Sequence, residues 1–185
     1  MQKRTKTTTR NLVCCALLAA LSVVMARVLC FATPDGVRWS ADKFPLFLAG
    51  MLFGPVLGGL TGFTADFLGS IIQFGFNPLL CPPAILYGVF GGLMRHFIRK
   101  NPNLLRLGIS YLLPVVLGSI LYQSAMLSYF YFDGTLWAGF LYYLGTRTFQ
   151  FSIMLVAEVA IIFILLKTRI FTRMGLWNPG KDETK

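Results

Sequence analysis

The chain has 185 residues, of which 56% are hydrophobic and only 13% are charged, and its mean hydropathy is +0.67. This composition excludes a soluble globular domain, because a chain of this length could not bury so much apolar surface. The formal net charge of +10 suggests nucleic acid at first sight. The basic residues, however, gather in short groups beside apolar blocks, at 3–10, 95–106 and 167–185. This placement is typical of cytoplasmic loops and termini of a membrane protein, and it argues against a nucleic-acid partner.

The first apolar block, 11–31, follows a basic segment at 1–10 and is long enough to cross a bilayer. Its basic start is also typical of a signal peptide. Its apolar run is long for that role, however, and no clear A-x-A cleavage site follows, so we expect a helix that is retained. The loop at 32–43 comes next and contains Pro-Asp-Gly, which favours a turn.

Two shorter apolar helices are expected at 44–54 and 56–73, on either side of Pro55. Each is shorter than the ~20 residues of a full span, so together they could form a tight hairpin shielded by protein. Glycine recurs at every fourth position of this segment, at Gly50, Gly54, Gly58 and Gly62. Such a row of small residues predicts that the two helices pack closely.

The rest of the chain alternates between apolar blocks and polar connections. A loop is expected at 74–81, a helix at 82–98, a basic loop at 99–106, a helix at 107–131, a loop at 132–138, a helix at 139–166 and a polar tail at 167–185. The predicted fold class is therefore all-α: an integral membrane protein with a six-transmembrane-helix bundle over 11–166.

The basic groups also predict how this bundle is oriented. Six helices place both termini on one side, and the basic connection at 99–106 falls on that side too. The positive-inside rule then makes both termini cytoplasmic, with the loops at 32–43, 74–81 and 132–138 outside.

Charged residues within membrane helices are expensive and usually contact a ligand, a partner or water. Arg27 and Arg147 lie near the outer ends of the first and last helices, at similar depth. Arginine holds a carboxylate with a planar fork of donors. Asp66 could pair with an arginine, or it could accept hydrogen bonds from amino and ring N–H groups of a ligand. Glu158 lies deeper, which favours a pairing within the membrane or a partner contact.

The external loops carry aromatic and polar residues that could cap a ligand at the outer face. The candidates in these loops are Arg38, Trp39, Phe74, Asn77 and Trp137. Aromatic rings could stack on a flat heterocycle, so a pocket that combines them with arginine and a carboxylate suits a flat, partly anionic molecule.

Motifs for catalysis or metal binding are not found. The sequence has no P-loop, no H-E-x-x-H and no G-x-S-x-G, and its cysteines form no C-x-x-C pair. We therefore predict no catalytic residue, no metal site and no ATP hydrolysis by this chain itself.

Small residues form two parallel rows on the first helix, Ala16 with Ala20 and Cys15 with Ala19. This spacing brings one helix face close to another helix. The neighbouring helix could belong to this chain's own bundle or to another protein, and the spacing leaves both possibilities open.

Two stretches carry a resemblance to a known family: ALLAALSVVMAR in the first helix, and RWSADKFPLFLAGMLFGPVLGGLTGFTADFLG after it. Over about 10–170 the chain resembles the substrate-binding S components of energy-coupling factor (ECF) vitamin transporters. It is most similar to the folate-specific S components. The resemblance implies a multi-pass protein of the cell membrane that binds folate from outside with high affinity, uses no cofactor and is not an enzyme.

The resemblance also implies protein partners, namely a transmembrane coupling subunit and two ABC ATPase subunits. An alanine motif on the first helix of the family docks on the coupling subunit, and Ala16 with Ala20 matches that motif here.

Two alternatives are weighed against folate. The chain could be an S component for another vitamin, such as riboflavin, thiamin or biotin. A small integral-membrane enzyme acting on lipids would need a polar catalytic cluster, which is not visible. Folate carries two glutamate carboxylates that arginines could meet, whereas thiamin is cationic. The predicted substrate-binding residues are Arg27, Arg38, Trp39, Asp66, Phe74, Asn77, Trp137 and Arg147.

Overall fold

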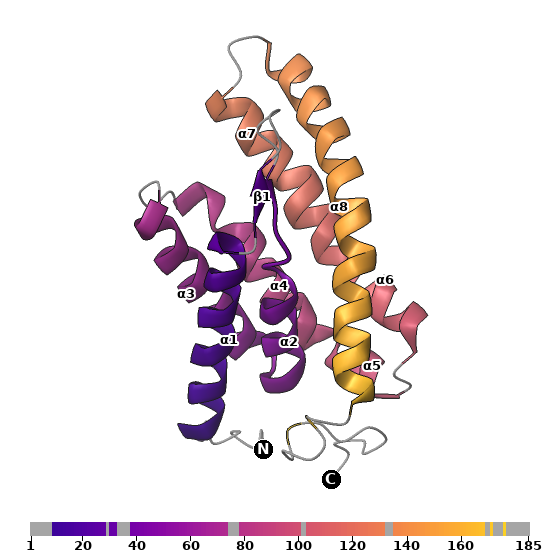
Figure 1. The fold of residues 1–185 in the computed structure, drawn as a ribbon. Helices are drawn as coiled ribbons and strands as arrows, with labels where there is room; N and C mark the ends of the chain where they lie inside the picture. Colours follow the sequence, from indigo (N-terminus) through magenta and orange to yellow (C-terminus); the bar gives the residue numbers. More distant parts are fainter. Residues whose placement is uncertain are drawn as a thin grey trace, which may run out of the picture.

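The computed structural model describes residues 9–28, 30–32, 38–73, 78–100, 103–131, 135–168, 171 and 176, which are mainly helical (Figure 1). Within this part of the chain, 4 helices are long and apolar enough to cross a membrane, at Thr9–Arg27, Pro55–Ile72, Leu104–Phe130 and Leu136–Lys167. Shorter apolar helices occupy Phe44–Phe53 and Pro78–Leu93. The prediction of a helical membrane protein is thus confirmed.

Helix α1 (Thr9–Arg27) ends earlier than the expected boundary at Phe31. Strand β1 (Phe31–Ala32) instead pairs antiparallel with strand β2 (Arg38–Trp39), and Phe31 lies opposite Trp39. The pairing needs extended backbone at Phe31, so the helix must end before it. The sequence pattern did not predict this short sheet.

Helix α2 (Phe44–Phe53) lies at the centre of the molecule, and its residues from Phe44 to Leu52 are all buried. A helix that is apolar on every side can be buried on every side. Gly54 then turns the chain with a φ of 98°, a conformation that glycine adopts without strain. Helix α3 (Pro55–Gln73) follows and is long enough to cross a membrane, so the expectation that it is too short was wrong.

The glycine row packs the hairpin closely, as predicted, and the packing extends to α4 (Pro82–Leu93). A Cβ atom at Gly50 or Gly58 would overlap the carbonyl oxygen of Gly88, and a Cβ atom at Gly88 would overlap that of Gly58. The three backbones therefore meet without side chains between them.

We expect Gly88→Ala to destabilise the protein by roughly 1–3 kcal/mol, the usual cost of overpacking, because the added methyl group meets backbone that cannot rotate away. Unfolding of the purified protein in detergent, followed against temperature, measures this. Gly145→Ala is the matched control, since nothing lies within 4 Å of a Cβ atom there. Equal stability of the two variants would contradict the close packing.

The second half of the chain forms the other side of the bundle. Its elements are α5 (Arg95–Lys100), α6 (Leu104–Pro114), the π-helix η2 (Val115–Tyr122), α7 (Gln123–Tyr131) and α8 (Leu136–Lys167), while the short η1 (Pro78–Leu80) precedes α4. The helix expected at 82–98 is therefore divided between α4 and α5. The start of α1, the end of α8 and α5 lie at one end of the molecule, and the α7–α8 pair projects beyond the other helices at the opposite end (Figure 1).

Candidate binding cavity

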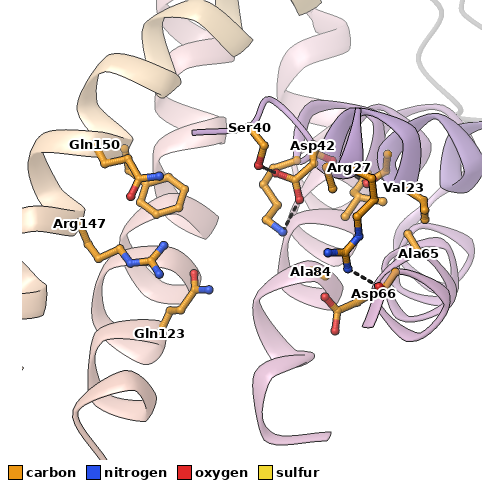
Figure 2. Close-up of a pocket in the computed structure, with 16 residues that line it drawn as sticks. Val23, Arg27, Ser40, Asp42, Ala65, Asp66, Ala84, Gln123, Arg147 and Gln150 are labelled. Carbon is orange, nitrogen blue, oxygen red and sulfur yellow. Dashed lines mark hydrogen bonds and ion pairs between the residues drawn. The ribbon is translucent and has the colours of Figure 1, made fainter. Parts of the chain in front are cut away.

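A cavity of about 280 Å³ lies between α1, α2 and α3 on one side and α7 and α8 on the other (Figure 2). Polar side chains account for much of its wall: Ser22, Arg27, Ser40, Asp42, Lys43, Asp66, Gln123, Arg147 and Gln150. Polar groups within apolar, membrane-spanning helices are expensive, so the convergence of several of them from α1, α3, α7 and α8 on one space indicates a binding site.

Arg27 and Asp66 form the first wall. Arg27 lies in the last turn of α1, and its guanidinium donates a hydrogen bond to the carbonyl oxygen of Gly69 on α3. A Cβ atom at Gly69 would lie 3.2 Å from the guanidinium, so glycine leaves room for it. Asp66, on the same helix, lines the cavity, and its buried Oδ2 atom has no hydrogen-bond partner within the described residues.

Asp42 organises the part of this first wall that lies at the start of α2. Its carboxylate accepts hydrogen bonds from Ser40 Oγ at 2.8 Å and from Lys43 Nζ at 2.7 Å. Its backbone carbonyl accepts one from Ser22 Oγ at 2.7 Å, which links it to α1. Burial disfavours the charged form of Lys43, but the nearby carboxylates, foremost that of Asp42, together outweigh this and raise the pKa of Lys43. The pair is therefore charged but close to neutral as a whole.

The second wall comes from α8 and the start of α7. Arg147, Gln150 and Phe151 share one face of α8, and the Arg147 guanidinium lies 5.8 Å from the centre of the Phe151 ring. No carboxylate of the described residues lies within 4.0 Å of Arg147. Gln123 begins α7, and its buried Oε1 atom has no hydrogen-bond partner within the described residues.

These groups can recognise a ligand from both sides. A buried acceptor without a hydrogen bond costs about 1–3 kcal/mol, so Asp66 Oδ2 and Gln123 Oε1 favour a ligand that donates N–H groups. A guanidinium that faces the same space favours a ligand that also carries carboxylates or carbonyl oxygens. Figure 2 shows Arg147 and Gln123 on one side of the space and Arg27 and Asp66 on the other.

The structure brings Arg27, Asp66 and Arg147 of the predicted site together in this cavity. Trp39 is half-buried in β2, and Trp137 is 75% exposed beside an apolar groove between α7 and α8; neither lines the cavity. The backbone of Arg38 lies in β2. Phe74 and Asn77 lie outside the described residues.

Sequence reasoning missed Gln123, Gln150, Asp42 and Lys43 as cavity residues. The glutamines carried a usable signal. Amide side chains in otherwise apolar membrane helices are costly without a polar contact, by the same argument that singled out the charged residues.

The protein is mainly helical, several of its helices are long enough to cross a membrane, and a polar, charged cavity lies between them. These features are typical of a membrane-embedded protein that binds a small molecule. The family model of the ECF transporter, substrate-specific component, matches residues 10–171. The chain belongs to this family, and it is a transport subunit of the membrane rather than an enzyme, as predicted.

Individual relatives agree with the family. The chain is 37% identical over 81 residues to the folate transporter FolT of Clostridium novyi (strain NT). That match covers 40% of this chain and 46% of the relative, so it spans less than half of the relative's length. The crystal structure of FolT bound with folic acid is similar over 85% of this chain and 93% of that chain, with a TM-score of 0.68 and 25% sequence identity.

Proposed function

We propose that this chain is the folate-binding S component of an ECF-type importer, which takes folate from outside the cell. The observation that carries the proposal is the likeness of nearly the whole fold to FolT bound with folic acid. The partial sequence match to a folate transporter supports the same substrate.

The chemistry of the cavity is consistent with folate. The pterin ring presents amino and ring N–H donors, which suit the acceptors Asp66 Oδ2 and Gln123 Oε1. The glutamate end presents carboxylates, which suit Arg147 and Arg27. A cationic vitamin such as thiamin would bring no carboxylate to the Arg147 guanidinium.

The proposed importer also contains a transmembrane coupling subunit and two ABC ATPase subunits. Ala16 and Ala20 are exposed on α1, whereas Cys15 and Ala19 on the adjacent row are buried at 7% and 3% exposure. The buried row thus serves packing within this chain, and the exposed row is left for the coupling subunit. Close contact between helices requires small side chains, which this row has.

The identity of the ligand can be tested directly. The protein is purified in detergent from cells grown with folate, and the co-purified small molecule is identified by mass spectrometry. Folate or a reduced folate is the expected result. Recovery of riboflavin, biotin or thiamin in its place would assign another vitamin and reject the proposal.

We further propose six membrane spans with both termini in the cytoplasm. Single cysteines replace Asp35, Asp133 or Lys100 in a background that lacks the native cysteines. A membrane-impermeant maleimide applied to intact cells should label Asp35→Cys and Asp133→Cys but not Lys100→Cys, because basic segments stay inside. Asp35 and Asp133 lie outside the described residues, and Lys100 ends α5. The reverse pattern of labelling would invert the topology.

A further inference from the structure

Glu158 is a buried carboxylate on α8 that the cavity does not use. It is 1% exposed and is absent from the cavity lining. Its Oε2 atom accepts a hydrogen bond of 2.5 Å from the hydroxyl of Tyr111 on α6. Its Oε1 atom accepts one of 3.3 Å from the backbone N–H of Lys43, at the start of α2. One side chain therefore joins three helices.

The contact with Lys43 supplies a helix cap, which the residues of α2 do not provide themselves. Lys43 is the N-cap residue of α2, and its own side chain makes no capping hydrogen bond. The first N–H groups of a helix have no partner within the helix, and a carboxylate at this end is favoured by the helix dipole. Glu158 thus performs from α8 the role that an acidic residue of the first turn has in a capping box.

This contact also connects the two walls of the cavity. Arg147 and Gln150 lie on α8, about two to three turns before Glu158, whereas Asp42 and Lys43 lie at the start of α2. The bond between Glu158 and the Lys43 N–H therefore joins the helix of one wall to the segment that carries polar groups opposite it.

We infer that Glu158 is a positioning residue: it holds the start of α2 against α8 so that the two walls of the cavity stand at the spacing a ligand needs. Its partner Tyr111 is 0% exposed and packs edge-on against Phe47 of α2, with ring centres 5.0 Å apart. Tyr111 thereby orients the carboxylate while Glu158 orients the start of α2.

Three variants separate positioning from general stability. Glu158→Gln keeps an acceptor for the Lys43 N–H, and its amide N–H can donate to the Tyr111 oxygen. Glu158→Leu removes both bonds. Ile162→Ala opens the core one turn further along α8, where Ile162 is 0% exposed, and leaves both bonds in place.

Two readouts are measured for each purified variant, alongside its melting temperature in detergent. Hydrogen exchange, followed by mass spectrometry on the peptide that contains Lys43, reports the cap itself and needs no ligand. Calorimetric titration with folate reports the cavity and rests on the proposed function. In Glu158→Leu we expect faster exchange at Lys43 and about tenfold weaker folate binding, whereas Glu158→Gln should retain both properties. Ile162→Ala should melt at a lower temperature but bind folate as the unmodified protein does.

The outcomes are distinguishable. If the unmodified protein does not bind folate, the proposed function fails, and the exchange at Lys43 alone decides this inference. If Glu158→Leu leaves that exchange unchanged, or if Ile162→Ala weakens folate binding as much as Glu158→Leu does, Glu158 only stabilises the core. Tyr111→Phe replaces Glu158→Leu in both readouts if the leucine variant does not fold.

Discussion

Tryptophan at Ala16 or at Ala20 will abolish folate uptake and leave folate binding to the isolated protein nearly intact. Both alanines lie on the exposed face of α1, so an indole there does not disturb the packing of this chain. It would, however, hold the coupling subunit away from the helix, because close helix contact depends on small residues. Uptake of labelled folate by cells that express the whole importer measures the first effect, and calorimetry on the purified chain measures the second.

The neighbouring row provides the matched control. Ala19 is 3% exposed, so Ala19→Trp should disrupt the packing of α1 against the bundle and reduce folding and binding together. The two rows lie on the same helix and receive the same substitution. The variants therefore differ only in whether the added indole points into this chain's own bundle or away from it. Loss of binding in Ala16→Trp equal to that in Ala19→Trp would place the exposed row inside this chain's own bundle.

Removal of the Arg147 side chain is expected to weaken folate binding by roughly ten- to hundredfold. A charge-assisted hydrogen bond contributes about 1.5–3 kcal/mol, and each factor of ten corresponds to about 1.4 kcal/mol. Arg147 faces the cavity with no carboxylate of the described residues within 4.0 Å, so its charge is available to a ligand. Arg147→Lys should recover part of the loss, because a point charge cannot reproduce the bidentate fork.

Calorimetric titration of Arg147→Ala with folate, and with a pterin that lacks the glutamate tail, measures the effect and its origin. The pterin should lose less affinity than folate if the guanidinium binds the tail. Arg27→Ala should act in the same direction, although part of its effect comes from the lost hydrogen bond to Gly69. Arg106→Ala is the control, since Arg106 does not line the cavity. Its guanidinium lies 5.2 Å from the centre of the Phe97 ring. Unchanged affinity of Arg147→Ala for both compounds would make this arginine structural.

Several features of the site were accessible from the residue pattern. Arg27, Asp66 and Arg147 were selected because charges are costly inside apolar helices, and all three line one cavity. The aromatic residues Trp39 and Trp137 were selected for a different reason, because rings in the external loops could stack on a ligand, and they lie outside the cavity. Aromatic rings occur in membrane interfaces, in surface grooves and in protein cores, so the presence of a ring in a loop does not show that it lines a binding site.

The membrane class, the approximate helices, the family resemblance and the close glycine contacts follow from the residue pattern, because each depends on local composition and spacing. The direction in which each helix faces emerges only when the helices pack together. Helix α2 is apolar on every side, so no polar stripe marks its rotation or its central place. Likewise, Gln123, Gln150 and Asp42 join one cavity, and Glu158 caps α2, through contacts between residues far apart in the chain. Such contacts arise when helices pack, and no local pattern encodes them.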